Sequence, residues 1–115
     1  MALPTEIRLD RAARLLRVQY DDGVSYALPL EYLRVESPSA EVQGHGPGQK
    51  IWFGGKREVA VTAVEPVGHY AVRLVFDDGH DSGIFSWDYL RELGQQYDRR
   101  WSAYLDALAA RGLSR

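Results

Sequence analysis

Residues 72–82 read VRLVFDDGHDS, and residues 16–26 read LRVQYDDGVSY. Each stretch alternates apolar and polar residues, as a strand with one buried face does, and then reaches Asp-Asp-Gly, which favours a tight turn into a second strand. The tripeptide Tyr-Leu-Arg follows each return strand, at residues 32–34 and 89–91. The repeat therefore predicts two hairpins, each running into a helix, but it indicates no particular reaction.

The rest of the chain supplies further elements around the two hairpins. Ile7 and Leu9 alternate with charged residues and predict a short first strand, and valines at 59, 61 and 64 predict another strand. Ser86 suits the N-cap of the second helix. An apolar stripe at helical spacing runs through residues 97–108 and predicts a C-terminal helix. We expect an α+β fold, a mainly antiparallel sheet built from two repeated hairpin-helix units, with residues 1–95 as the module and residues 96–115 as a helical extension packed on it.

Composition narrows the classes of function. A chain of 115 residues without cysteine supports one domain and excludes disulfides and thiolate sites. Its net charge of −2 comes from interspersed signs, without the basic cluster that nucleic acid requires. No apolar run approaches the roughly 20 residues of a membrane span, and residues 1–18 do not resemble a secretory signal. We expect a cytoplasmic protein with neither a nucleic-acid nor a membrane partner.

The strings DDGHDSGIFSWDYLREL (residues 77–93) and RLLRVQYDDGVSYALPLEYLRV (residues 14–35) resemble the gamma-butyrobetaine hydroxylase-like N-terminal domain family. The resemblance covers roughly residues 5–95, and residues 78–90 are its most specific part. It implies a module that precedes the catalytic domain of oxygenases using iron and 2-oxoglutarate, that is fused to ATPases carrying iron–sulfur clusters, and that occurs alone in bacteria. Residues 37–46 look like the standalone branch. The implied partner is an unknown protein of an iron–sulfur or iron-oxygenase pathway. The iron ligands of the oxygenases lie outside the module, so oxygenase activity is not carried over.

The resemblance also implies a zinc site, formed by three cysteines and the histidine of the DGH string, here His80. The three cysteine positions fall on Ser37, Ser39 and Val42. A structural zinc site needs four good donors, so we predict that this zinc is lost and that no cofactor is bound. The alternative is a metal site rebuilt around His80 and His45. A third interpretation makes His80 a structural histidine that bonds the segment 36–50.

The segment 36–50, ESPSAEVQGHGPGQK, predicts a long polar loop, and it leads into Ile51-Trp52-Phe53 before two glycines. We expect His45, Trp52, Phe53 and His80 to form a partner-binding surface, while the alternative is that Trp52 plugs the core. No serine lies in a nucleophile-elbow pattern, and the glycines around His45 match no phosphate-binding loop. The prediction is a non-catalytic accessory or interaction domain without catalytic residues.

Overall fold

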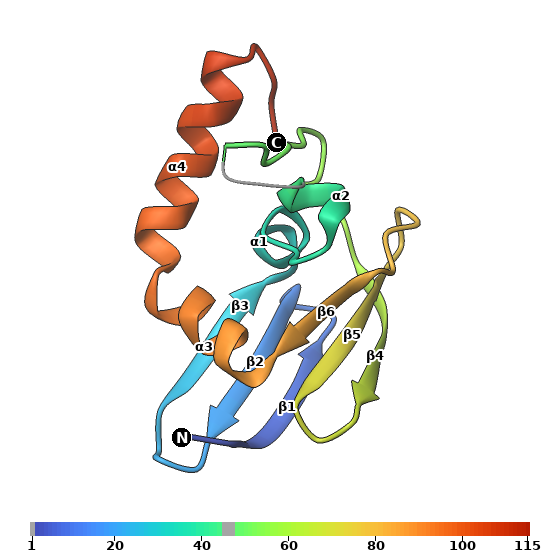
Figure 1. The fold of residues 1–115 in the computed structure, drawn as a ribbon, viewed down its shortest axis with the longest axis vertical. Helices are drawn as coiled ribbons and strands as arrows, with labels where there is room; N and C mark the ends of the chain where they lie inside the picture. The colour runs from blue at the N-terminus through green and yellow to red at the C-terminus, as the bar shows by residue number, and fades with distance from the viewer. Residues whose placement is uncertain (1, 45–47) are drawn as a thin grey trace.

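The computed structural model describes residues 2–44 and 48–115. The chain folds as two copies of a strand–strand–strand–helix unit (Figure 1). Repeat 1 consists of β1 (Pro4–Asp10), β2 (Leu15–Tyr20), β3 (Ser25–Pro29) and α1 (Leu30–Val35). Repeat 2 consists of β4 (Val61–Val67), β5 (Ala71–Phe76), β6 (Gly83–Ser86) and α3 (Trp87–Gln95). The short helix α2 (Ala40–Gln43) lies between the repeats in the sequence, and α4 (Tyr97–Ala110) follows them.

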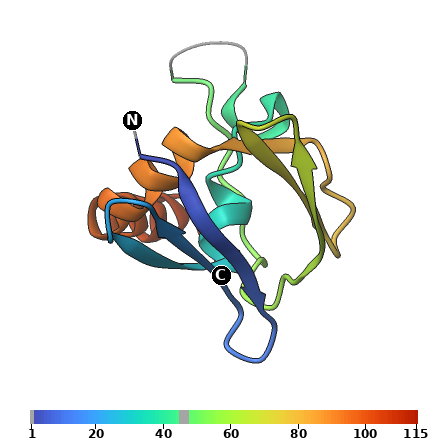
Figure 2. The same ribbon diagram turned by 90° about the horizontal axis from the view of Figure 1, so that it is seen from below.

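Each repeat forms its own antiparallel sheet of three strands, in the orders β1-β2-β3 and β4-β5-β6. Helix α1 lies centrally between the two sheets, and α4 runs along one side of the molecule (Figures 1 and 2). The predicted α+β class, the two hairpin-helix units and the C-terminal helix are confirmed. The strands divide between two sheets because each repeat pairs only its own strands.

The duplication extends further than the hairpins. The first strands, β1 and β4, each have seven residues and break register at the same place, between Pro4 and Glu6 in one and between Val61 and Ala63 in the other. The two Asp-Asp-Gly turns also match, and Gly23 and Gly79 have φ values of +87° and +90°. A residue with a β-carbon adopts this backbone region poorly, which explains the glycine in both turns.

The helix of each repeat bonds the turn of the other repeat. Arg34 of α1 donates from Nε to Asp78 Oδ2 at 2.8 Å, and Arg91 of α3 donates from Nη2 to Asp22 Oδ2 at 2.6 Å. These reciprocal bonds make the two repeats interlock with approximate twofold symmetry. Arg34 is the more deeply buried, since its side chain is 7% exposed against 23% for Arg91.

The main core gathers apolar side chains from both sheets, α1 and α3. All six residues of α1 are buried, and its Tyr32 hydroxyl donates to the main-chain oxygen of Leu93 in α3 at 2.7 Å. A second cluster of Val35, Tyr104 and Leu108 packs α4 against the end of α1. Within residues 2–44 and 48–115, no helix has the length and apolar character needed to cross a bilayer.

Candidate functional site

The turn of repeat 2 meets the segment that follows α1, and we call this meeting point the His80 corner: Ser37, Ser39, Glu41, Val42, His80 and Gly83. The imidazole of His80 bonds at both nitrogens, with Nδ1 2.8 Å from Glu41 Oε2 and Nε2 2.8 Å from Ser37 Oγ. His80 is only 3% exposed and Ser37 is fully buried. The interpretation of His80 as a histidine that bonds the segment 36–50 agrees with these contacts.

Local structure holds the corner in place. Asp78 accepts the main-chain N–H of His80 at 3.2 Å, which sets the end of the turn. Ser39 caps α2 by accepting the N–H of Glu41 at 3.2 Å, and its hydroxyl lies 2.8 Å from that of Ser82. Gly83 makes room for these groups, because a β-carbon there would lie 2.4 Å from Ser37 Oγ. The corner therefore depends on a residue without a side chain.

A carboxylate, an imidazole and a hydroxyl are thus joined in sequence. The carboxylate of Glu41 accepts from Nδ1, which leaves Nε2 of His80 to accept the hydroxyl of Ser37. The same order of groups activates a serine in hydrolases, but there the hydroxyl faces a substrate. Here the hydroxyl is enclosed, so the geometry satisfies a buried imidazole. Sequence reasoning missed Glu41, and its only sequence signal is its place beside Val42 at a family ligand position.

The four positions that the resemblance relates to zinc do lie together, but they do not fit a zinc ion. Only His80 carries a nitrogen donor, both of its nitrogens are hydrogen-bonded, and Val42 is fully buried with no donor atom. A four-ligand structural site would lack its thiolates. Within residues 2–44 and 48–115, no group of three or more His, Cys, Asp or Glu residues surrounds a possible metal position. The predicted ligand His45 lies outside the described residues.

Asp78 connects the corner to an aromatic residue. Its Oδ2 accepts from Lys56 at 2.6 Å and from Arg34 at 2.8 Å. Burial alone would raise the pKa of Asp78, but the bonds from Lys56 and Arg34 outweigh it and lower the pKa to about 2. Both cations also lie over the ring of Phe53, with the Arg34 guanidinium carbon 4.9 Å and the Lys56 ammonium 5.7 Å from the ring centre. Phe53 is therefore linked to the turn that carries His80 through the two cations that bind Asp78.

Trp52 contacts different residues from Phe53. Its ring packs against the cluster of Val35, Tyr104 and Leu108, and the Lys50 ammonium lies 4.3 Å from its centre. Trp52 is half-buried, so it shields the second cluster, as the core-plug alternative proposed, and still keeps part of its ring at the surface.

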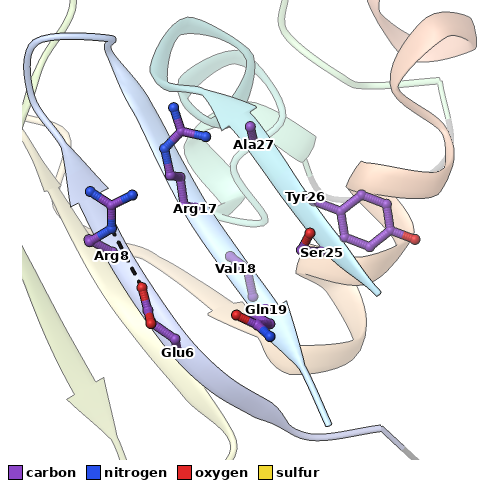
Figure 3. A pocket seen from close by; sticks show the side chains of 8 residues that line it. All are labelled: Glu6, Arg8, Arg17, Val18, Gln19, Ser25, Tyr26 and Ala27. Carbon is purple, nitrogen blue, oxygen red and sulfur yellow. Dashed lines mark ion pairs between the residues drawn. The ribbon is translucent and has the colours of Figure 1, made fainter. Parts of the chain in front are cut away.

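A shallow hollow of about 360 Å³ on the outer face of the β1-β2-β3 sheet is the other candidate (Figure 3). Arg8 and Arg17 stand opposite each other there in register. Each arginine has an acid partner, with Glu6 3.5 Å from Arg8 and Asp10 3.2 Å from Arg17. The face is therefore charge-balanced and open, and it offers less defined chemistry than the His80 corner.

Comparison with known proteins gives a consistent result. A family model described as gamma-butyrobetaine hydroxylase-like, N-terminal, matches residues 7–91. No curated protein matches the chain. One NMR solution structure is 51% identical with a TM-score of 0.85, covering 100% of this chain and 90% of that chain. Another is 43% identical with a TM-score of 0.86, covering 100% and 86%. A crystal structure of a protein of unknown function in the DUF971 family, from Acidithiobacillus ferrooxidans, is 46% identical with a TM-score of 0.67, covering 79% and 91%.

Proposed function

We propose a non-catalytic accessory role for this chain, starting from the finding that it belongs to the gamma-butyrobetaine hydroxylase-like N-terminal domain family, a family in which a solved relative has unknown function. In this proposal the domain binds another protein, of an iron–sulfur or iron-oxygenase pathway, through the 51–53 face. We define that face as Ile51, Trp52 and Phe53. The zinc site of the wider family is absent in this proposal.

The observation that carries the proposal is an exposed apolar residue on a well-anchored segment. Ile51 is 47% exposed, and its N–H donates to the main-chain oxygen of Val42 at 2.7 Å. Before it in the chain, Lys50 pairs with the buried Glu36 at 2.6 Å. After it, Phe53 lies under the guanidinium of Arg34. A preorganised apolar residue loses little entropy on binding, which suits an interface.

The burial of the His80 corner supports a role without catalysis. A serine nucleophile must reach the carbonyl or phosphoryl centre that it attacks, whereas Ser37 has no exposed surface and its hydroxyl is held by His80. We therefore assign His80 a positioning role. It holds the segment 37–42 against repeat 2, and this in turn places Ile51.

Affinity capture from cells of the native host, with bound proteins quantified by mass spectrometry, tests this role. Ile51→Ser should lose at least one partner that the wild type retains, because it removes the apolar contact without disturbing the core. Ile84→Ser is the matched control, since Ile84 is 45% exposed and lies on β6. Both variants should keep the wild-type melting temperature. Equal capture by wild type and both variants would contradict the assignment of this face.

A second candidate function is metal binding at a site rebuilt around His80 and His45. A metal there would replace the hydrogen bond that joins His80 Nδ1 to the Glu41 carboxylate at 2.8 Å, and both of these groups can bind zinc and iron. Elemental analysis of protein purified without chelator separates the two proposals. The accessory role predicts no stoichiometric metal. One equivalent that disappears in His80→Ala and persists in His69→Ala would establish the metal site instead.

A further inference from the structure

A groove of about 410 Å³ lies between the second half of α4 and the tail, residues 111–115, that follows this helix. Figure 1 shows the end of the chain turning back beside the segment that follows α2. We call this hollow the α4 groove, and its floor and rim are formed by four apolar residues and two arginines: Leu105, Leu108, Ala109, Leu113, Arg57 and Arg115. All of them except Arg57 lie beyond residues 7–91, which the family model matches, so the C-terminal extension builds this groove.

Hydrogen bonds fix the tail as one wall of the α4 groove. The N–H of Leu113 donates to Leu108 O at 2.9 Å, and the N–H of Gly55 donates to Ser114 O at 2.8 Å. The tail and the segment around Gly55 approach closely, because a β-carbon at Gly54 would lie 2.6 Å from Ser114 O. The groove is therefore preformed, and its residues lose little conformational entropy when a partner binds.

The floor of the α4 groove exposes large apolar side chains. Leu105 is 39% exposed and Leu113 is 44% exposed. Leu108, which also lines the floor, is buried in the second cluster with Val35 and Tyr104. The floor is thus the exposed edge of a packed apolar cluster. A large apolar side chain placed on it displaces water from both leucines, which favours binding.

The rim of the α4 groove carries an arginine without an acid partner. Within the described part of the chain, Arg57 makes no hydrogen bond or ion pair. The acid beside it in the sequence, Glu58, pairs with Arg14 at 3.1 Å. Glu31, which lies in a smaller adjacent hollow that Arg57 also lines, pairs with Arg115 at 2.7 Å. No acidic side chain is among the described residues that line the α4 groove, so its rim has a net positive charge.

We propose that the α4 groove binds an acidic, leucine-bearing segment of a partner protein, with an apolar side chain on the floor and a carboxylate on Arg57. Apolar grooves of this kind bind the apolar face of amphipathic segments. A carboxylate suits Arg57 because it accepts two parallel bonds from one guanidinium. A second copy of this chain suits the groove less well, because a twofold contact would bring the two copies of Arg57 together.

The inference goes beyond the proposed function, because the α4 groove and the 51–53 face share no residue. Either can therefore fail alone, and a partner bound at one surface leaves the other open to a different segment.

A peptide titration followed by NMR tests the proposal on the full chain. The probe is the acetylated and amidated peptide Glu-Glu-Leu-Leu-Glu-Glu-Leu-Leu-Glu-Glu. One control peptide carries glutamine in place of every glutamate, and a second carries alanine in place of every leucine. In ¹⁵N-labelled protein, the acidic leucine peptide should shift the amides of residues 105–109 and 112–115 and the Nε–H of Arg57. Both controls should bind more weakly, because one loses the charge and the other loses the apolar contact.

Variants make the assignment specific. Arg57→Gln should weaken binding of the acidic leucine peptide by roughly fivefold, as expected for an exposed ion pair, and should leave the affinity for the glutamine peptide unchanged. Arg99→Gln is the matched control, since Arg99 is an exposed arginine of α4 outside the groove, and it should bind as the wild type does. Leu105→Ser should weaken binding of both leucine peptides, whereas Ile84→Ser should not. All four variants should keep the wild-type melting temperature.

Three results would overturn the proposal. The first is equal affinity of the wild type for the acidic and glutamine peptides, or of Arg57→Gln and the wild type for the acidic peptide. The second is a set of shifts confined to residues 50–53, which would place the peptide on the 51–53 face. The third is a dimer of the free protein, seen by sedimentation and lost in Leu105→Ser, because a second copy would then occupy the groove.

Discussion

The turn of repeat 1 and the turn of repeat 2 share their Asp-Asp-Gly geometry but hold different side chains beside it. In repeat 1, Tyr26 follows the turn, and its ring lies so close to Gly94 that a β-carbon on that glycine would be 2.4 Å away. In repeat 2, the equivalent of Tyr26 is Gly83, and Ser37 takes up the space beside it. We call the first arrangement the Tyr26 corner. One corner is closed by an aromatic ring, and the other by a hydrogen-bonded polar group.

The same main-chain hydrogen bond closes both turns, although repeat 2 has one more residue between its paired strand positions. The N–H of Tyr20 bonds Val24 O at 2.8 Å, and the N–H of Phe76 bonds His80 O at 2.9 Å. Val24 and His80 are therefore equivalent positions with opposite polarity. The comparison teaches that a duplicated unit can keep its hydrogen-bonded frame in both copies while one copy becomes polar. In this chain the family's ligand positions fall on the polar copy.

The largest expected effect concerns the reciprocal arginines. Arg34→Met should lower the free energy of unfolding by about 3 kcal/mol, because it breaks a buried ion pair. Arg91→Met should cost less than about 1 kcal/mol, because the pair with Asp22 is more exposed. Denaturant unfolding measures both. Equal losses would show that depth of burial does not distinguish the two repeats.

A smaller loss of stability should distinguish the His80 corner from the Tyr26 corner when a side chain is added at Gly83. Gly83→Ala should cost about 2 kcal/mol, because its β-carbon would overlap Ser37 Oγ. Ser37→Ala should also destabilise, because it leaves Nε2 of the buried His80 without its partner. In the double variant Gly83→Ala/Ser37→Ala the overlap is gone. Its loss of unfolding free energy should therefore be smaller than the sum of the two single losses. A purely additive double-mutant cycle would contradict the packing seen here.

The turns themselves should behave alike. Gly23→Val and Gly79→Val should each destabilise by more than about 1 kcal/mol, because a β-branched residue fits positive φ poorly. No atom lies within 4 Å of a β-carbon built at either glycine, so the penalty comes from the backbone alone and should be similar in both. Urea midpoints of the two variants provide the measurement, and unchanged midpoints would refute the turn geometry.

The smallest effect should appear in the pH dependence of the two turn carboxylates. The pKa of Asp78 is lowered from 3.8 to about 2, so its contribution to stability is complete above pH 4 and is lost as the pH falls to about 2. Asp78→Asn should therefore be destabilised at pH 7, by roughly 1 kcal/mol since the amide keeps some hydrogen bonds, and the deficit should shrink towards pH 2. Asp22→Asn should show a smaller deficit, since Asp22 is exposed. A deficit for Asp78→Asn that stays constant with pH would contradict the ion pairing.

Several features were predictable because they depend on neighbouring residues. The Asp-Asp-Gly turns follow from glycine's access to positive φ, and Ser86 does cap α3 by accepting the N–H of Tyr89. Two residues depend on packing beyond their neighbours. Pro66 lies inside β4, because β4 is an edge strand where a missing N–H is tolerated. Gly94 lies inside α3, which continues to Gln95, and this glycine makes room for Tyr26.

The candidate site was predictable only in part. The resemblance placed Ser37 and His80 near each other, and the structure brings them to 2.8 Å. Glu41 was missed because no local pattern links a carboxylate to an imidazole 39 residues away. The two possibilities for Trp52 could not be resolved from the sequence, because three large apolar residues in a row cannot all face one way. The structure turns Trp52 onto the second cluster and leaves Ile51 exposed.

By itself, the sequence determined the repeated elements of this protein, since alternation, turn glycines and helix caps act over a few residues, but it predicted a loop where α2 forms within residues 36–50. The tertiary structure decided which repeat's arginine pairs with which repeat's aspartate, which corner became polar, and which buried acid pairs with Arg115. These choices depend on long-range packing. The two Tyr-Leu-Arg tripeptides are identical, but the side chain of Arg34 is more deeply buried than that of Arg91. The segments 37–60 and 96–115 pack around only one end of the symmetric pair. The same local pattern therefore has a different environment in each copy.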